Sequence, residues 1–180
     1  MITIQRQKTA IARSNVSVPT KWAFEQGIIA DGSSVFDWGC GKGADVKWLR
    51  EQGCTVVGYD PYHAPMFNPD TLPFKNFDVI ICNYVLNVIE CPQERIDLIQ
   101  KIVHSAGKDC KIMFSARPDK QINKEGKKNG WKVYSDGFIT SHNTFQKGYN
   151  LEELIDLVGA FSDTELSHSY KSSGGVVCVY

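Results

Sequence analysis

The stretch VFDWGCGKGADVKWL, Val35 to Leu49, gathers three glycines and an aspartate into the seven residues Asp37–Gly43. The apolar run Ser33–Trp38 that leads into it predicts a strand, and the pattern of Ala44–Gln52 that follows predicts a helix. Glycine is a poor residue for either element, but it permits positive φ and lets a ligand lie against the main chain. The turn is therefore a predicted ligand site, and the alternative is a tight turn whose glycines only permit helix–strand packing.

The rest of the chain continues the alternation of strand and helix. Further strands are predicted at Cys54–Asp60, Phe77–Tyr84 and Cys110–Ser115, with a helix over 92–106 between the last two. Asn150 is a candidate N-cap for a helix in NLEELIDLVGAF, and SDTELSHSY and GGVVCVY predict two closing strands around a KSSGG turn. This order favours an α/β fold with a mostly parallel, doubly wound sheet and a C-terminal antiparallel hairpin.

One domain accounts for the 180 residues, because no repeat or linker divides them. Residues 1–32 are predicted to form an N-terminal arm with a short helix at PTKWAFEQGI, and residues 33–180 the domain itself. Three segments carry weaker patterns. The proline-rich 60–74 is predicted to be a surface loop with room for a short edge strand, Lys120–Asn129 an exposed polar excursion, and 135–149 a hairpin.

Composition narrows the class of protein. The formal net charge is zero, so nothing global draws the chain to nucleic acid or to an anionic membrane. No apolar run approaches the roughly 18 residues of a membrane helix, and the N-terminus lacks the apolar stretch of a signal peptide, so a soluble cytoplasmic protein is predicted. The six cysteines are scattered without a CxxC pair, which predicts reduced, structural cysteines and no metal site.

Asp60 closes the second predicted strand, 23 residues after Asp37. Ligands of open parallel sheets bind at the carboxyl ends of the strands, where an acidic residue accepts hydrogen bonds from ribose hydroxyls. The rival interpretation is a carboxylate that only caps the turn DPYH. The order of glycine cluster, helix and spaced carboxylate predicts a nucleoside-containing cofactor across the strand ends.

The glycine spacing distinguishes between such cofactors. A dinucleotide site uses G-x-G-x-x-G, so that the pyrophosphate sits on the helix end, whereas this chain has G-x-G-x-G with Asp37 two residues before Gly39. A carboxylate in that place repels pyrophosphate but suits a cationic amino-acid tail. S-adenosylmethionine, which carries a sulfonium and an ammonium group, is therefore predicted rather than NAD.

The motifs also carry a family resemblance. The stretch from Val35 to Pro61 resembles the first two motifs of class I S-adenosylmethionine-dependent methyltransferases, FDVIICNYVLNVIECPQER resembles their fourth-strand motif, and GGVVCVY is similar to their reversed last strand. KTAIARSNVSVP, GYDPYHAP, YVLNVIE and DGFITSHNTFQK are similar to the branch associated with DNA phosphorothioation clusters. The resemblance implies a single-domain Rossmann-like methyltransferase fold with S-adenosylmethionine as cofactor.

The resemblance also implies roles for individual residues. Cofactor-binding residues are expected at Asp37, Gly39, Cys40, Gly41, Asp60, Pro61, Tyr62 and Asn83. The glycine turn would border the methionine portion, Asp60 the ribose, and the two residues after it the adenine. Asn83 and Tyr84 would face the sulfonium and the transferred methyl group as catalytic candidates. Asp70 is the nearest candidate for the acidic residue that follows the third strand of such enzymes.

The acceptor is not marked by a motif. Asn83-Tyr84 lacks the two prolines of the Asn/Asp-Pro-Pro-Tyr/Phe signature of amino-methylating DNA enzymes, and no Pro-Cys motif indicates cytosine C5 methylation. His142, in a loop that can reach the cleft, is a further catalytic candidate, with a surface histidine as the alternative; His63 has the same status. The lysines and aromatic residues of 117–147 predict a patch for DNA or RNA, with a solvated loop as the alternative.

The main interpretation is an S-adenosylmethionine-dependent methyltransferase that modifies a nucleic acid or a nucleotide-like substrate. A non-catalytic S-adenosylmethionine-binding module of a DNA-modification or defence assembly is the second interpretation, and a nicotinamide-dependent reductase is the third. The basic arm residues Arg6, Lys8 and Arg13 are predicted to bind a phosphate or to close over the cofactor, with a solvated arm as the alternative. The sequence gives no oligomeric state.

Overall fold

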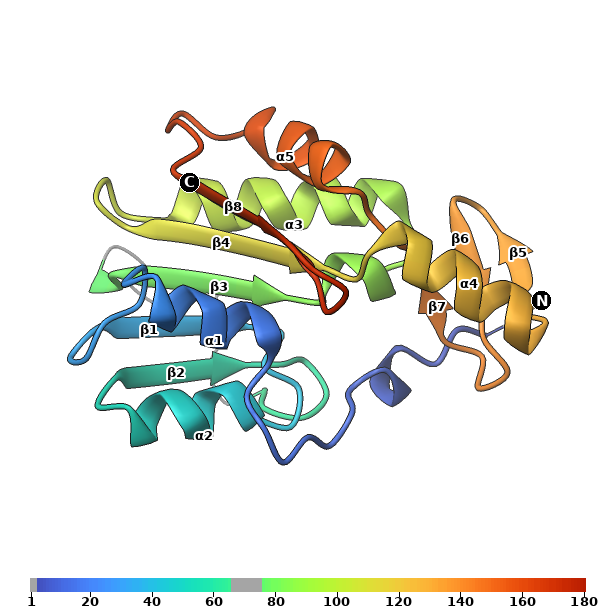
Figure 1. Cartoon of the computed structure of the whole chain (residues 1–180), viewed down its shortest axis with the longest axis horizontal. Helices are drawn as coiled ribbons and strands as arrows, with labels where there is room; N and C mark the ends of the chain where they lie inside the picture. Colours follow the sequence, from blue (N-terminus) through green and yellow to red (C-terminus); the bar gives the residue numbers. More distant parts are fainter. Residues whose placement is uncertain (1–2, 66–75) are drawn as a thin grey trace.

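The computed structural model describes residues 3–65 and 76–180 (Figure 1). Its elements are, in chain order, η1 (Arg6–Lys8), α1 (Val18–Glu25), β1 (Ser34–Trp38), α2 (Ala44–Glu51), β2 (Thr55–Tyr59), β3 (Val79–Asn83), η3 (Leu86–Val88), α3 (Pro92–Ser105), β4 (Lys111–Ala116), α4 (Asp119–Asn129), β5 (Lys132–Tyr134), β6 (Gly137–Ile139), β7 (Phe145–Gln146), α5 (Leu151–Gly159), β8 (His168–Lys171) and β9 (Val176–Val179). The predicted strands β1 to β4 and helices α2 and α3 are confirmed within two residues.

The main sheet is mostly parallel. Its strand order is β2-β1-β3-β4-β9-β8, with parallel pairs from β2 through β4 and antiparallel pairs at β4–β9 and β9–β8. The predicted fold class, a doubly wound Rossmann-like sheet with an antiparallel C-terminal hairpin, is confirmed. From β1 the chain goes to β2 on one side and later to β3 on the other. The carboxyl end of β1 therefore lies at the switch point where such sheets bind ligands.

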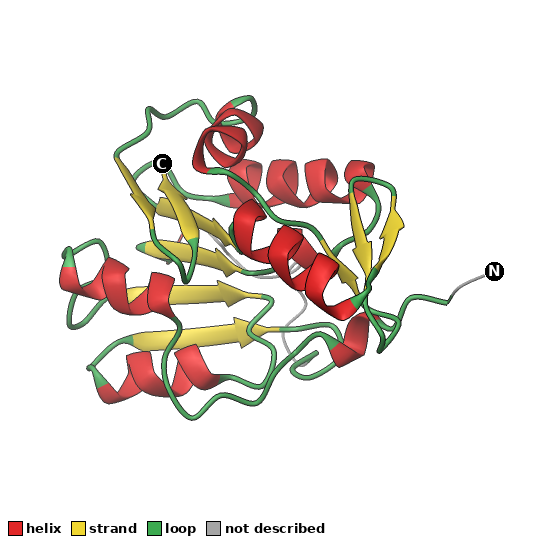
Figure 2. Ribbon diagram, turned by 45° about the vertical axis from the view of Figure 1, so that its right-hand side comes forward, coloured by secondary structure: helices red, strands yellow, loops and turns green. Residues whose placement is uncertain are grey.

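Helices cover both faces of this sheet, and alternate strand residues point to opposite layers (Figures 1 and 2). Phe36, Ile80 and Phe114 pack in one core with residues of α3 and α5. Their strand neighbours Val35 and Ile81 pack in the other core with residues of α1 and α2. Burial on both faces explains why β3, Val79–Asn83, is a continuous apolar run until its last residue.

The segment after β4 differs from its prediction. Lys120–Asn129 is not an exposed excursion but most of helix α4, which turns Ile122 and Gly126 inward. The ring of Phe138 lies so close to Gly126 that an added Cβ would come within 3.1 Å of it. The inward face of α4 has only one apolar side chain and one glycine, so the sequence shows no apolar pattern at helical spacing. The helix is stabilised by this tertiary contact rather than by its own sequence pattern.

A small second sheet follows α4. The predicted hairpin in 135–149 is present as β6 and β7, and β5 adds a third antiparallel strand, giving the order β5-β6-β7. This sheet and α4 stand beyond the carboxyl ends of the main strands (Figure 1). The predicted N-cap Asn150 is confirmed, because its Oδ1 accepts the Glu153 N–H at 2.8 Å.

Two further points concern the chain as a whole. Most of the proline-rich loop, its suggested edge strand and Asp70 lie outside the described residues. Within 3–65 and 76–180, no helix is both long enough and apolar enough to cross a membrane.

Candidate functional site

The glycine-rich turn occupies the carboxyl end of β1. Gly39, Gly41 and Gly43 have φ values of 79°, 53° and 78°, in a backbone region that residues with a Cβ rarely adopt. A Cβ on Gly39 would also collide with Cγ2 of Val85, and one on Gly41 would lie 3.3 Å from Cβ of Ala10. Bare main chain is therefore needed here for the backbone conformation and for close packing.

The amides of this turn are mostly engaged within the protein. Gly39 and Cys40 both donate to the carbonyl oxygen of Tyr59, at 2.7 and 2.9 Å, and Gly43 donates to Cys40. These bonds hold the turn against the end of β2. These donors have partners, and the ionisable side chains close to the turn are largely acidic. This arrangement suits a cationic group better.

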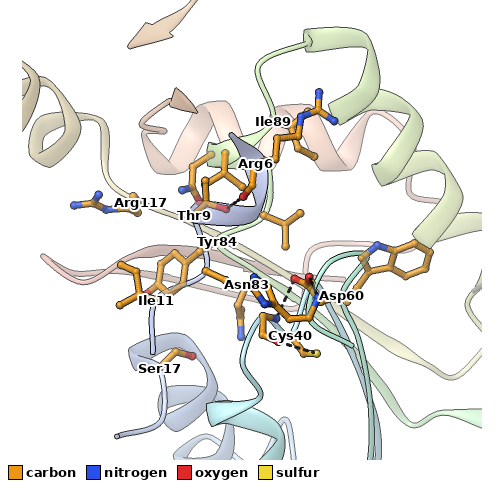
Figure 3. Close-up of a pocket in the computed structure, with 18 of the residues that line it drawn as sticks. Arg6, Thr9, Ile11, Ser17, Cys40, Asp60, Asn83, Tyr84, Ile89 and Arg117 are labelled. Atoms are coloured by element: carbon orange, nitrogen blue, oxygen red, sulfur yellow. Dashed lines mark hydrogen bonds between the residues drawn. The ribbon is translucent and has the colours of Figure 1, made fainter. Parts of the chain in front are cut away.

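Asp60 lies at the end of β2 and lines the cleft in front of the turn (Figure 3). Its Oδ2 accepts the Gly41 N–H at 3.2 Å, and its Oδ1 accepts the N–H groups of Tyr62 and His63 at 2.9 and 3.0 Å. The two interpretations of this residue are thus compatible, because one carboxylate caps its own turn and also faces the cleft. Pro61 and Tyr62 line the cleft beside it.

Asp37 is buried behind the turn, with 2% of its surface exposed, and it is not among the residues that line the cleft. Burial raises the pKa of its carboxyl well above the usual range, and the negative charge of Asp45 raises it further; Arg13 opposes this in part, and Asp60 adds a smaller increase. A cation bound near the turn would relieve this repulsion. Asp37 can therefore act on such a ligand through its field.

Asn83 ends β3 within a buried hydrogen-bond network. Its Nδ2 donates to Thr20 Oγ1 at 2.8 Å and its Oδ1 accepts from Ser115 at 2.8 Å. Asp45 anchors the same network by accepting from Ser17 Oγ at 2.6 Å and Thr20 Oγ1 at 2.8 Å. The Asn83 amide, which also lines the cleft, thus joins the start of α1 to the strand ends.

Tyr84 follows Asn83 with a positive φ of 60°. Its hydroxyl donates to the carbonyl oxygen of Gly174 at 2.7 Å, and Arg13 lies over its ring at 6.0 Å. Burial raises the pKa of the phenol to about 12. Tyr84 therefore stays protonated at neutral pH, and it offers the cleft a fixed aromatic surface.

The N-terminal arm forms the opposite wall of the cleft, whose volume is about 970 Å³ (Figure 3). Arg6 makes a bidentate pair with Glu90, at 2.7 and 2.8 Å, and contacts Glu94 at 2.7 Å. The carbonyl oxygen of Gln7 lies 3.1 Å from His63 Nε2. Of the alternatives for the basic arm, closure over the cleft is the one that these contacts support.

Sequence reasoning missed part of this wall. Thr9, Ala10 and Ile11 line the cleft; they lie in the stretch KTAIARSNVSVP, but they carry no charge and the resemblance gave them no individual role. The Ser17-Val-Pro-Thr pattern, an N-cap with proline in the first turn, was the available signal that α1 begins where the arm ends.

A second cavity of about 510 Å³ adjoins the cleft and shares Arg117, Glu125 and Gln146 with it. His142 lines this second cavity and not the cleft. Of the three catalytic candidates, the structure thus brings Asn83 and Tyr84 to the cleft and places His142 beside it.

Thiol and metal chemistry are not indicated in the described part of the chain. The six cysteines are free, and burial raises the pKa of Cys40 to about 12, helped by the charge of Asp37. Among residues 3–65 and 76–180, no group of three or more His, Cys, Asp or Glu side chains is placed to hold a metal ion.

Comparison with known proteins agrees with this geometry. A family model described as a methyltransferase domain matches residues 14–160. A search of proteins with curated functions gives no significant match.

Solved structures with the same fold are distant in sequence. An S-adenosylmethionine-dependent methyltransferase of Methanosarcina mazei is 16% identical, with a TM-score of 0.66 over 86% of this chain and 94% of its own. The 1,6-didemethyltoxoflavin-N1-methyltransferase of Burkholderia thailandensis is 16% identical, with a TM-score of 0.60 over 90% and 76%. A Rhodobacter sphaeroides protein named for zinc-dependent alcohol dehydrogenases is 13% identical, with a TM-score of 0.64 over 99% and 98%. At these identities the likeness shows the fold alone.

Proposed function

The chain belongs to the methyltransferase domain family, with S-adenosylmethionine as its methyl donor, and from this premise we propose that it methylates a nucleic acid or a nucleotide-like molecule. The observation that carries the choice of acceptor is the placement of a lysine-rich helix, α4, beside a cavity that adjoins the donor cleft.

The residues of the cleft fit this donor. The acidic surroundings of the turn suit the ammonium and sulfonium charges, and Gly39, Cys40 and Gly41 of the turn line the cleft. The turn Gly39–Gly41 would border the methionine portion, with Asp37 buried behind it and acting through its field, and Asp60 would bind the ribose hydroxyls. Pro61 and Tyr62 would flank the adenine.

The state of Tyr84 restricts the acceptor. When bound, the donor supplies a methyl group on a positively charged sulfur, which an acceptor lone pair takes by in-line displacement. A protonated phenol that already donates to Gly174 does not remove a proton from the acceptor. Glu94 and Glu125 in the cleft are engaged with Arg6 and Arg117. These contacts favour an acceptor that needs no prior deprotonation, such as a ring nitrogen of a nucleobase.

The charges around the second cavity support a polyanionic substrate. Four lysines on α4 are exposed, Lys120, Lys124, Lys127 and Lys128. Exposed Val133 and Tyr134 on β5 follow, with 71% and 41% of their surfaces accessible. Because the formal net charge of the chain is zero, such a local patch is how this protein would attract phosphates.

Methyl transfer tests the acceptor class directly. Tritiated donor is incubated with plasmid DNA, tRNA and a mixture of nucleotides, and label in any of them is expected. If a nucleic acid is labelled, replacing the four α4 lysines with alanine should raise its KM and flatten the salt dependence of binding. Lys108→Ala is the matched control, because Lys108 is exposed and precedes β4, at the amino end of the strand. Label that enters none of the three pools would refute the proposal.

Asp60→Asn tests the donor assignment. Asparagine can still accept the turn amides of Tyr62 and His63 through its carbonyl oxygen, but it loses the acceptor that faces Gly41. Hydrogen bonds to a charged group contribute about 1.5–3 kcal/mol, so calorimetry should show donor affinity roughly 10- to 100-fold lower. Exposed Asp163→Asn should bind like the wild type. Equal affinity in both variants would remove Asp60 from the donor site.

We also propose the finer placement in the branch associated with DNA phosphorothioation. Two of the stretches that resemble it, KTAIARSNVSVP and GYDPYHAP, both contribute residues to this cleft. Oligonucleotides with and without phosphorothioate linkages distinguish this placement, because preferential methylation of the former is expected and equal rates would count against it.

A further inference from the structure

The second cavity has walls from four parts of the chain. They are Arg117 after β4, helix α4, Trp131, and the β6–β7 hairpin with its turn at 140–144. The cavity meets the donor cleft at Arg117, Glu125 and Gln146, which line both. Its volume of about 510 Å³ is within the range of small-molecule sites. A group held there lies next to the donor cleft.

We propose that this cavity is the acceptor subsite and that it takes an uncharged, planar nitrogen heterocycle, the base portion of the substrate. The inference rests on the proposed function and specifies it further, because it assigns the base to the cavity and the phosphates to the lysines outside. Nothing in the motifs of the donor half indicates such a division.

The charges of the cavity are balanced. Arg117 Nη2 lies 2.6 Å from Glu125 Oε1, and Gln121 Nε2 donates to the same oxygen at 3.1 Å. Thr140 and Thr144 share a hydrogen bond of 2.7 Å. An anion placed here would lose its hydration and compete with Glu125 for Arg117, which is unfavourable. A neutral group that exchanges hydrogen bonds with hydroxyls and amides avoids this cost.

The cavity also offers a surface for a flat ring. Trp131 is half-buried and is supported by Phe138, with ring centroids 6.4 Å apart. Aromatic side chains fixed in this way are the usual platforms on which bases stack. The lysines of α4 are exposed on the same helix that contributes Glu125 and Asn129 to the wall. A base inside and phosphates outside would satisfy both surfaces.

A half-satisfied amide, that of Asn87, contacts Gln146, which lines both spaces. Asn87 is 1% exposed, lines the donor cleft, and donates through Nδ2 to Gln146 Oε1 at 3.3 Å. Its Oδ1 is buried and accepts no hydrogen bond from the described residues. A buried acceptor without a donor destabilises the free protein. An N–H group on the acceptor, reached by a small rotation of the Asn87–Gln146 pair, would supply that donor.

The four tryptophans allow the two sites to be observed separately. Trp38 lines the donor cleft and Trp131 the second cavity, whereas Trp22 and Trp48 pack on the far side, against Tyr170 and Phe24. Protein labelled with 5-fluorotryptophan gives one fluorine NMR signal for each, assigned by single substitutions to phenylalanine. S-adenosylhomocysteine is added first, and then adenosine, guanosine, cytidine, thymidine or their 5′-monophosphates.

The product of the donor should move the Trp38 signal, and at least one neutral nucleoside should then move the Trp131 signal while the Trp22 and Trp48 signals stay unchanged. A Trp131 signal that responds to no nucleoside, although Trp38 has responded to the donor product, overturns the inference and leaves the donor site intact. Response only to monophosphates overturns the neutral character of the cavity. Failure of Trp38 to respond would instead count against the donor assignment.

A kinetic measurement completes the test once an acceptor is labelled. Trp131→Leu should raise the acceptor KM roughly 5- to 150-fold through loss of stacking, with donor affinity unchanged. Trp48→Leu is the control, because Trp48 on α2 packs against Phe24 and lines neither cavity. An equal effect of the two substitutions on KM would refute a stacking role for Trp131.

Discussion

Replacing Gly39 with alanine tests why the turn after β1 contains bare main chain. Gly39 has a φ of 79°, and its N–H donates to the Tyr59 carbonyl oxygen at 2.7 Å, so the backbone cannot change conformation without losing that bond. The position that a Cβ would take is already occupied by Cγ2 of Val85. Two separate costs are therefore expected, one from the dihedral angle and one from the collision.

Their magnitudes follow from the two situations. A left-handed conformation costs a residue with a Cβ about 1–2 kcal/mol, and forcing a methyl group into packed surroundings costs about 1–3 kcal/mol. Gly39→Ala should thus lower the free energy of unfolding by about 2–5 kcal/mol. Gly32→Ala is a matched control, since its φ is 81° and a Cβ there would meet nothing within 4 Å. It should show only the first cost.

Urea denaturation of both variants, with Val85→Ala and the Gly39→Ala/Val85→Ala double variant, measures the two costs. Removing Val85 Cγ2 should recover the collision cost, so the cycle should give a favourable coupling of about 1–3 kcal/mol. If glycine were needed only for contact with the donor, Gly39→Ala and Gly32→Ala would be equally stable and only donor binding would suffer. That result would refute the packing argument.

Three other perturbations address the surroundings of the cleft. Arg6→Ala removes the ion pairs that hold the arm to α3 and to the loop before it. Stopped-flow measurements should therefore show several-fold faster release of S-adenosylhomocysteine. An unchanged rate would mean that the arm does not control ligand release from the cleft. Asp37→Asn should gain stability relative to the wild type as the pH rises above about 4, the usual carboxyl pKa in the unfolded chain. The reason is that the raised pKa of Asp37 makes ionisation of this carboxyl costly in the folded state of the wild type. A stability difference between the two proteins that is independent of pH would contradict this. Arg95→Met leaves Asp136 with only Lys147, at 3.8 Å; because Asp136 is 38% exposed, the loss should be about 2 kcal/mol in urea denaturation, below the roughly 3–5 kcal/mol of a fully buried pair. Asp136→Asn instead leaves Arg95, which is 4% exposed, without its carboxylate partner and should cost more; an equal or smaller loss would argue against a buried-charge cost.

The placement of the glycine turn and of Asp60 at the candidate cleft could be predicted because their signals are local. The turn Gly39–Gly43 and Asp60 each follow directly from a strand that the apolar pattern predicts, and a parallel sheet brings strand ends together without further information. The contact between Gly41 and Asp60 is thus a consequence of the β1–β2 register. Backbone conformation at the glycines was equally readable, since few other residues tolerate it.

The contacts made by the N-terminal arm, by the Asn83 side chain and by helix α4 could not be predicted by the same means. Arg6 and Glu90 are 84 residues apart in the sequence, and no periodicity links an irregular arm to a loop. Asn83 was placed correctly at a strand end, but its partners Thr20 and Ser115 come from elements whose packing the sequence does not specify. Helix α4 escaped prediction because its inward face has only one large apolar residue, Ile122.

The arm has a consequence for how donor and acceptor are linked. Its residue Ala10 lies over Gly41 in the donor turn, and its Gln5 N–H donates at 2.7 Å to the carbonyl oxygen of Asn143. Asn143 belongs to the turn of the β6–β7 hairpin that forms a wall of the second cavity. One short segment therefore touches both sites, and a donor that orders the arm also restrains the hairpin turn. Because such coupling is reciprocal in binding free energy, an acceptor that fills the cavity should tighten donor binding by the same factor.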